Sequence, residues 1–193
     1  LGVTNTVTTS AAFQDSLDIA AATANGRLTL TSPIGIRAGT TGNVALTANA
    51  AGSLATSVTL GLTSNANGLL GLDNASLAGQ SFAVTGAAYD YAVAAVTNRP
   101  LVFGNVRAGV ALANQTLTFG NTAQSDPAYQ DALLVATTAT NGKLTATGAT
   151  ITAGNSGDLV IAASTTTAGS LAETLSVALT SQAAAAGLLD KPL

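Results

Sequence analysis

The sequence predicts an all-β protein made of two antiparallel β-sandwiches in tandem. Three observations support this prediction. Apolar and polar residues alternate with a period of two along many short segments, as they do in half-buried strands. Turn-forming Gly, Asn and Pro residues separate these segments about every ten residues, which is typical of sandwiches and barrels. The chain also contains a long internal repeat.

The repeat aligns the first part of the chain with the second, at an offset of 116 residues between Asn5 and Asn121. The later match of Gly52 with Gly169 is offset by 117 residues. A period of this size exceeds the coils of solenoids, about 20–50 residues, and fits a whole domain of about 100 residues. We therefore expect tandem immunoglobulin-like antiparallel β-sandwiches. The matched segments are Leu1–Thr6 with Leu117–Thr122, Phe13–Asp15 with Tyr129–Asp131, Asn25–Leu28 with Asn141–Leu144, and Gly52–Ala55 with Gly169–Ala172.

The repeat predicts the domain boundaries: module 1 over residues 1–93, a linker over 94–99, and module 2 over 100–193. Two segments occur only once, Leu77–Tyr89 and Arg99–Gly109. Module 1 is therefore expected to lack a first strand, and module 2 a last strand. Such modules could be completed by flanking repeats of the same chain or by head-to-tail strand exchange between copies.

The alternation predicts strands in both modules. Asn25-Gly26 and Asn141-Gly142 favour type I′ turns, which need positive φ at both central residues. Residues 65–74 fit either a loop with buried leucines or a short helical turn. The expected strands are 1–7, 13–20, 27–31, 43–48, 54–63 and 81–86 with a possible extension over 89–93, then 101–103, 110–119, 128–136, 143–146, 159–163 and 171–179.

The composition excludes several classes of function. Of the 193 residues, 47% are hydrophobic and only 8% are charged, with a net charge of −3. Ample apolar content and low net charge argue against disorder, and the mild acidity argues against nucleic acid as a partner. No apolar run reaches the roughly 18 residues of a membrane span. Because Cys and His are absent, disulfides, thiolate metal sites and Ser-His triads are excluded.

The candidate chemistry is sparse, and we expect neither an enzyme, nor a cofactor, nor a metal site. Asp15 and Asp131 recur in the repeat, each after an aromatic residue and a Gln. They could form half of a calcium site, but calcium takes six to eight oxygens and the nine acidic residues are scattered. We therefore favour a role in turn or edge structure. Residues 104–109 have the spacing of two glycines in a phosphate loop, but no Lys-Ser/Thr follows.

Three motifs carry a family resemblance: Leu101–Gly109 (LVFGNVRAG), Leu117–Thr122 (LTFGNT) and Leu77–Gly86 (LAGQSFAVTG). Together they resemble Hydin-type immunoglobulin-like domains, above all those of bacterial "choice-of-anchor D" repeat proteins. The resemblance implies a secreted or cell-surface repeat protein without catalytic residues. The usual Phe-x-Pro of the family is replaced here by Ile161–Ser164 (IAAS), so partners such as the cytoskeleton are not carried over.

Two functions fit these observations. The first is a structural protein of an extracellular filament, sheath or surface stalk, assembled from modules through self-association. The second is an adhesin-type module that binds a glycan or a protein. Loop tips rich in Ala, Gly, Thr and Ser favour the first. The residues expected to exchange strands lie in the two segments that occur once: Leu101, Val102, Phe103, Gly104, Val106, Phe82, Val84 and Gly86.

Overall fold

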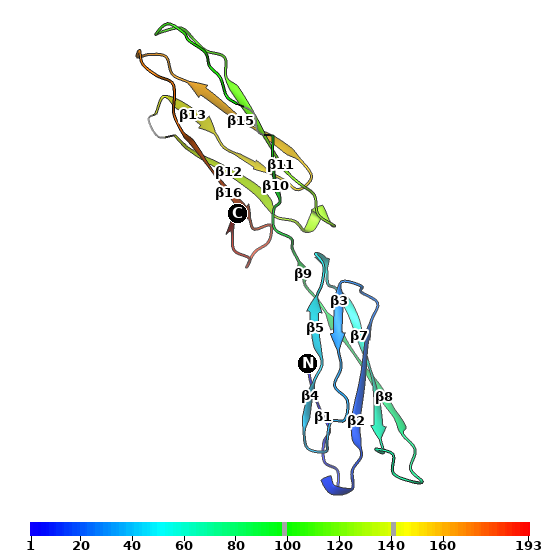
Figure 1. Ribbon diagram of the computed structural model, residues 1–193. Helices are drawn as coiled ribbons and strands as arrows, with labels where there is room; N and C mark the ends of the chain where they lie inside the picture. Colours follow the sequence, from blue (N-terminus) through cyan, green and yellow to red (C-terminus); the bar gives the residue numbers. More distant parts are fainter. Residues whose placement is uncertain (98–99, 140–141) are drawn as a thin grey trace. The chain divides into compact units, whose positions relative to one another are not determined.

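The computed structural model describes residues 1–97, 100–139 and 142–193. It divides the chain into two compact units, Leu1–Ala88 and Tyr89–Leu193 (Figure 1). Strands dominate both, and the only helices of the described residues are two 3-10 turns, η1 (Ala11–Phe13) and η2 (Pro127–Tyr129). The prediction of an all-β chain with antiparallel sheets is confirmed.

The second unit contains two four-stranded antiparallel sheets. The strand order of the first is β10-β11-β15-β13, and that of the second is β14-β12-β16-β17. The strands of the first sheet are β10 (Ala94–Val96), β11 (Gln115–Asn121), β15 (Ser156–Ala163) and β13 (Leu144–Thr147). Those of the second are β14 (Ala149–Ile151), β12 (Ala132–Ala139), β16 (Leu175–Gln182) and β17 (Lys191–Pro192).

One core joins these two sheets. Leu159 and Ile161 of β15 pack with Leu133 and Val135 of β12, and all four are almost completely buried. Their spacing of two along each strand is the pattern of a sheet with one buried face. The sheets therefore share a hydrophobic layer, and the finer immunoglobulin-type arrangement stays a prediction.

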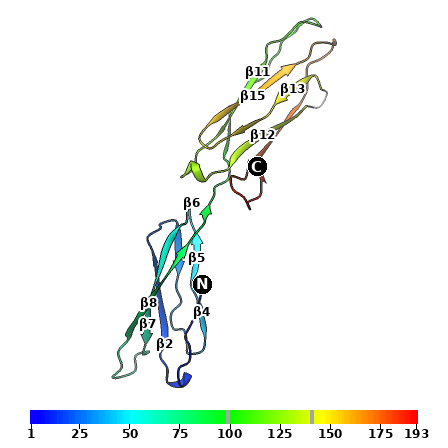
Figure 2. The same ribbon diagram turned by 180° about the vertical axis from the view of Figure 1, so that it is seen from behind.

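The first unit is built from one three-stranded sheet and several two-stranded ladders (Figure 2). One sheet has the strand order β2-β7-β8, and three two-stranded ladders pair β1 with β4, β3 with β5 and β6 with β9. Their bounds are β1 (Gly2–Thr4), β2 (Ser16–Thr23), β3 (Leu28–Thr31), β4 (Thr41–Asn43), β5 (Ala45–Ala48), β6 (Gly52–Ser53), β7 (Thr56–Asn65), β8 (Ala75–Val84) and β9 (Ala87–Ala88). The core consists of Leu17, Ile19, Ile36, Val44, Val58 and Leu60.

The sequence repeat is also a repeat of contacts. The isolated bridge between Leu17 and Ile36 corresponds to the pairing of Leu133 with Ile151 between β12 and β14. In the first unit Pro33 precedes this position, and a proline has no N–H with which to continue a ladder. The bridge therefore stands alone where the second unit has a strand.

The boundary between the units differs from the predicted linker over residues 94–99. Ala94–Val96 form β10, which pairs with β11 in the second unit, and residues 98–99 lie outside the described residues. Tyr89 also belongs to the second unit, not to an extension of the closing strand of module 1. Residues 101–103, predicted as the first strand of module 2, form no strand.

Two local predictions were wrong, and one lies outside the described residues. Neither Asn25 nor Gly26 has positive φ, because this turn does not join paired strands: β2 pairs with β7, and β3 pairs with β5. The side chain of Asn25 instead accepts a hydrogen bond from the Arg27 N–H at 3.0 Å. Phe13, expected in a strand, lies in η1 and is 93% exposed. Asn141, of the second predicted turn, lies outside the described residues.

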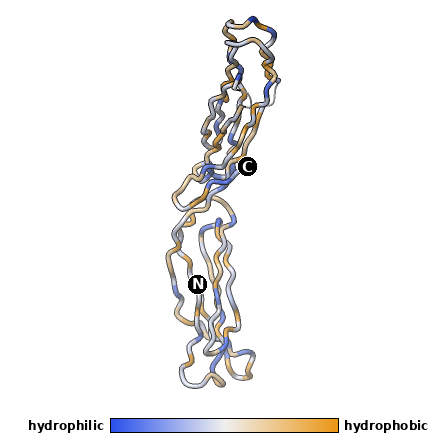
Figure 3. Tube along the Cα trace, turned by 90° about the vertical axis from the view of Figure 1, so that its left-hand side faces the viewer, coloured by the Kyte–Doolittle hydropathy of each residue, from blue (hydrophilic) through white to orange (hydrophobic). Residues whose placement is uncertain are grey.

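In the ambiguous segment over residues 65–74, Asn65 is the last residue of β7, and residues 66–74 form a loop whose leucines are exposed. Hydrophobic and hydrophilic residues alternate along both units in Figure 3. Among the residues that the structure describes, there is no helix with the length and hydropathy needed to span a membrane.

Leu159 and Val160 offer a matched test of the core. They are neighbours in β15, but Leu159 is fully buried and Val160 is 36% exposed on the opposite face. Leu159→Ala should lower the free energy of unfolding of the second unit by about 2–5 kcal/mol. Val160→Ala should change it by less than about 1 kcal/mol.

The measurement is urea denaturation followed by tyrosine fluorescence. All three tyrosines, Tyr89, Tyr91 and Tyr129, lie in the second unit, so the signal reports the unfolding of that unit. Equal losses in the two variants would contradict the placement of the core.

Candidate assembly site

The outer edge of β16 is an open backbone edge of the second unit over half of its length. On one side β16 pairs with β12 over its whole length, from Leu175 to Gln182. On the other side β17 pairs only with Thr180 and Ser181, and the Leu193 N–H donates to the Leu179 carbonyl at 3.0 Å. In the described part of the chain, residues 175–178 have no strand neighbour on that side.

The first unit shows what covers the corresponding edge. There β8 pairs with β7 from Thr56 to Ser64. Val58 and Leu60 of β7 are buried beneath this sheet, whereas Leu175 and Val177, at the repeated positions of β16, are only half-buried. A strand like β8 would therefore cover both the edge of β16 and the apolar side chains beside it.

A groove follows this edge. Leu175 and Val177 line it from β16. The rest of its apolar lining comes from other parts of the second unit: Leu101, Phe103, Leu117, Leu144, Leu171 and Ala172. Since Leu101, Phe103, Leu117, Leu175 and Val177 also pack against the core of the second unit, the groove is an opening onto that core.

The predicted strand-exchange residues of β8 are engaged in the first unit. Phe82 and Val84 pack against the core of that unit. Gly86, just beyond the strand, has φ of 138°, a conformation that favours glycine, and its carbonyl accepts a hydrogen bond from the Leu54 N–H. These three residues therefore close their own unit.

The predicted residues of the second segment divide into two groups. Leu101 and Phe103 pack partly buried against the core. Val102 and Val106 are exposed, and Gly104 has φ of 71°. The segment is held by the loop around Thr165, whose carbonyl accepts the Gly109 N–H at 2.8 Å.

A buried polar cluster, which the sequence analysis did not assign, lies in the second unit. It consists of Asn121, Gln130, Asp131 and Ser181, all of them buried. The Asn121 amide donates to the carbonyls of Asp131 and Ile151 at 2.9 and 3.1 Å. The Gln130 amide donates to Asn121 Oδ1 at 3.1 Å, and Ser181 Oγ donates to Asp131 Oδ2 at 2.8 Å. The cluster thus ties β11, β12 and β16 together.

The first unit repeats this cluster with Asn5, Gln14, Asp15 and Ser64. The Asn5 amide donates to the carbonyls of Asp15 and Ile36 at 3.0 and 2.8 Å. The Gln14 amide donates to Asn5 Oδ1 at 2.7 Å, and Ser64 Oγ donates to Asp15 Oδ2 at 2.7 Å. The signal in the sequence was the recurrence of Asn, Gln and Asp at one offset, which identified the repeat but not the contacts.

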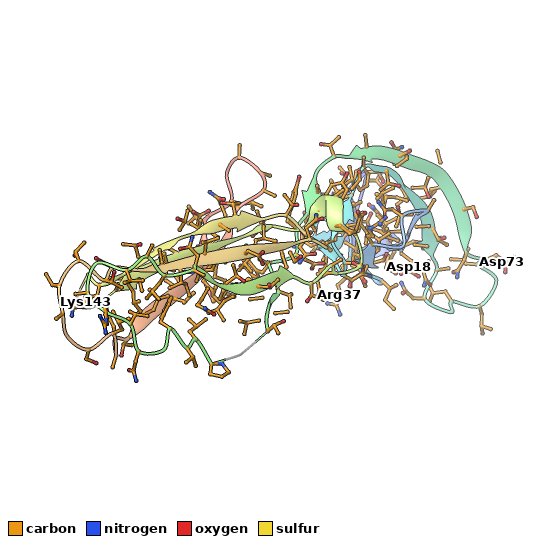
Figure 4. The ribbon with its side chains drawn as sticks, turned by 90° about the horizontal axis from the view of Figure 1, so that it is seen from above. Asp18, Arg37, Asp73 and Lys143 are labelled. Atoms are coloured by element: carbon orange, nitrogen blue, oxygen red, sulfur yellow. The ribbon has the colours of Figure 1, made fainter. Side chains whose placement is uncertain are left out.

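Asp15 and Asp131, considered above as half of a calcium site, therefore accept hydrogen bonds from the hydroxyl groups of Ser64 and Ser181. The described residues contain no group of three or more acidic residues that could hold a metal ion. Among the charged side chains labelled in Figure 4, Lys143 lies directly before β13 and Asp73 lies in the loop before β8.

Comparison of the chain with protein-family models, with curated proteins and with solved structures finds no match. The resemblance to Hydin-type domains stays a prediction.

Ser181→Ala tests the polar cluster. The substitution removes the acceptor of the Ala92 N–H, at 2.8 Å, and a donor to the buried Asp131 carboxylate. Each buried polar group that loses its hydrogen-bond partner lowers the free energy of unfolding by about 1–3 kcal/mol. We expect a loss of this size in the second unit, again measured by tyrosine fluorescence in urea. Ser64→Ala, the matched control in the first unit, should leave the tyrosine transition unchanged, and a Ser181→Ala variant as stable as the wild type would contradict the role of the cluster.

Asp18 on β2 provides a pH test. The Gly35 N–H and the Asn65 amide each donate to its carboxylate at 2.6 Å, and they lower the pKa of Asp18 from its ordinary value. A depressed pKa in the folded state stabilises the protein above the pKa of the unfolded state, and this contribution is lost as pH falls through the folded pKa.

The stability difference between wild type and Asp18→Asn should therefore shrink as the solution is acidified. Carboxyl NMR titration of the folded chain measures the pKa directly. A midpoint for Asp18 at or above that of an exposed aspartate would contradict the two hydrogen bonds.

Proposed function

We propose that this protein is a non-catalytic structural repeat protein of an extracellular filament, sheath or surface stalk, assembled from β-sandwich modules by strand addition. The observation that carries the proposal is the edge of β16, which is paired over two residues by β17, while its counterpart β7 is paired along its length by β8. Edges of this kind accept extended segments through main-chain hydrogen bonds.

The chemistry of the edge suits this role. Residues 175–178 read Leu-Ser-Val-Ala and carry no charge. Natural proteins block exposed edges with lysine, proline or short strands, and none of these interrupts β16. A covering strand would also bury Leu175 and Val177, and each Å² of apolar surface removed from water contributes about 25 cal/mol.

The geometry of the contact favours a filament. The edge of β16 belongs to the second unit, and β8, which pairs along the corresponding edge, belongs to the first; in a strand exchange, β8 of one copy would leave its own β7 and pair with β16 of the next copy. A contact between two different surfaces is heterologous, and such contacts propagate into open assemblies unless they close into a ring. The extracellular location and the immunoglobulin-type arrangement belong to the same proposal and rest on the repeat and the family resemblance.

An adhesin-type binding function has weaker support. A cleft of the second unit lies between residues 104–108 and 165–172, and small side chains dominate its lining. Arg107 is the charged residue among those that line it. Ligand sites are lined mainly by hydrophobic and aromatic side chains with a few convergent polar groups, and none of the described residues that line this cleft is aromatic.

Sedimentation velocity of the whole chain at about 1–100 μM tests the proposal, because strand addition between copies depends on concentration. We expect species that grow beyond a dimer as concentration rises. Val177→Lys places a charge on the apolar side of the β16 edge and should reduce association at least tenfold, since inward-pointing charges prevent edge pairing.

Ser176→Lys is the matched control, because Ser176 is the neighbouring residue and is exposed on the other face. It should associate as the wild type does. Tyrosine fluorescence is the check that both variants fold. A wild-type chain that stays monomeric over the whole range, or that stops at a dimer, would contradict assembly into a filament through this edge.

A further inference from the structure

In the second unit, the segment Tyr89–Val96 enters beside the polar cluster and is held by it. The Ala92 N–H donates to Ser181 Oγ at 2.8 Å, and the Val93 N–H donates to Asn121 Oδ1 at 3.0 Å. The Val93 carbonyl accepts the Thr122 N–H at 2.8 Å. Ser181, Asn121 and the neighbouring Thr122 therefore bind the backbone of this segment through hydrogen bonds.

The two ends of the same segment are held as well. The Asp90 N–H donates to the Tyr129 carbonyl, and the Asp90 carbonyl accepts the Asp131 N–H, both at 2.9 Å. The rings of Tyr89 and Tyr129 lie 5.4 Å apart. At the other end, Ala94–Val96 pair with β11 as β10, and Ala92 is buried in the core.

The first unit contains the same receiving surface, which we call the clamp: Asn5, Thr6, Phe13, Asp15, Ser64 and the outer edge of β1. Each member occupies the repeated position of a group that holds Tyr89–Val96 in the second unit. Asn5 corresponds to Asn121, Thr6 to Thr122 and Ser64 to Ser181. The internal hydrogen bonds of the cluster are already formed, so the surface is preorganised.

Nothing in the described residues fills this clamp. The Thr6 N–H, the Asp15 N–H and the Phe13 carbonyl have no hydrogen-bond partner among them, whereas their counterparts all bind the Tyr89–Val96 segment. β1 pairs with β4 alone, whereas β11 lies between β15 and β10. Phe13 is 93% exposed at the position where Tyr129 packs against Tyr89.

We propose that the clamp of the first unit binds an extended peptide segment with the sequence character of Tyr89–Val96. An aromatic residue of the segment would cover Phe13, its backbone would bond to Thr6, Asp15 and Ser64, and an alanine would enter the core. The inference rests on the proposed function, since it names the partner by which one module would join the next. The occupant is argued from the second unit, where this segment fills the equivalent surface.

The chemistry of the segment sets its specificity. Ala92 is 4% exposed, so a large side chain at this position would collide with the core that receives it. The ring at position 89 contributes an aromatic pair, and such pairs are worth about 0.5–1.5 kcal/mol, or roughly two- to tenfold in affinity. The backbone hydrogen bonds form only when the bound segment is extended, so binding depends on that conformation of the peptide.

The test uses the whole chain, isotopically labelled, and a synthetic peptide of residues 87–97 (AAYDYAVAAVT) with blocked ends. Binding should be saturable and should shift the NMR signals of Thr6, Asp15 and the Asn5 side-chain amide. The signals of Asn121, Thr122 and Asp131 should not move, because their own segment already occupies that site. They serve as the internal control.

Two variants and one altered peptide sharpen the test. A peptide with Phe at the position of Ala92 should bind at least tenfold more weakly. Phe13→Ala, at a position that is 93% exposed, should keep the fold and weaken binding by about two- to tenfold. Ser64→Ala should weaken it further when combined with Phe13→Ala, with the amide signals of β2 and β7 serving as the check on folding.

Absence of shifts at Thr6 and Asp15 at millimolar peptide would overturn the proposal, and so would unchanged binding of the Phe-containing peptide. Shifts confined to β16 would place the peptide on the other open edge and would equally overturn it. Sedimentation of the chain without peptide separates this result from the proposed function: association through β16 without peptide binding would leave that function standing. Peptide binding by a chain that stays monomeric would support the clamp and contradict self-association.

Discussion

The hydrogen-bond cluster of Asn, Gln, Asp and Ser is the constraint on which the rest of each unit depends. In the second unit it joins strands of both sheets, because Asn121 lies in β11 while Asp131 immediately precedes β12. Buried polar groups are tolerated when they are fully satisfied, and the described residues include no buried side-chain polar atom without a partner. The hydrophobic core supplies most of the stabilisation, while the cluster fixes which strands meet.

The segment over residues 75–96 contributes to the packing of both units. Its first part, β8, covers the core of the first unit. Its second part, from Tyr89 onwards, lies against the cluster of the second unit. One continuous stretch of chain therefore ends one module and begins the next. In this account, a module is complete only when a segment of this kind fills each of its two receiving surfaces, and repetition follows from that requirement.

The period-two pattern predicted the strands whose side chains alternate, such as β2 with Leu17 and Ile19, because a single buried face imposes that pattern. It missed β10, because Ala94-Ala95-Val96 does not alternate and is defined by its pairing with Phe119–Asn121. The turn at Asn25-Gly26 was mispredicted because its strands lie in different sheets. The repeat identified Asn5 and Asp15 as recurring residues. Only the fold shows that Ser64, nearly 50 residues away, donates a hydrogen bond to Asp15.

Hydrogen exchange of the backbone amides in the unliganded chain tests the central claim most directly. We expect strong protection of the Thr122 and Asp131 amides, which donate to the carbonyls of Val93 and Asp90. The Thr6 and Asp15 amides, at the same positions of the first unit, should exchange at least a hundredfold faster under conditions in which the core amides of β2 and β7 stay protected. Equal protection at the two pairs of positions would contradict the claim that the clamp is filled in the second unit and open in the first.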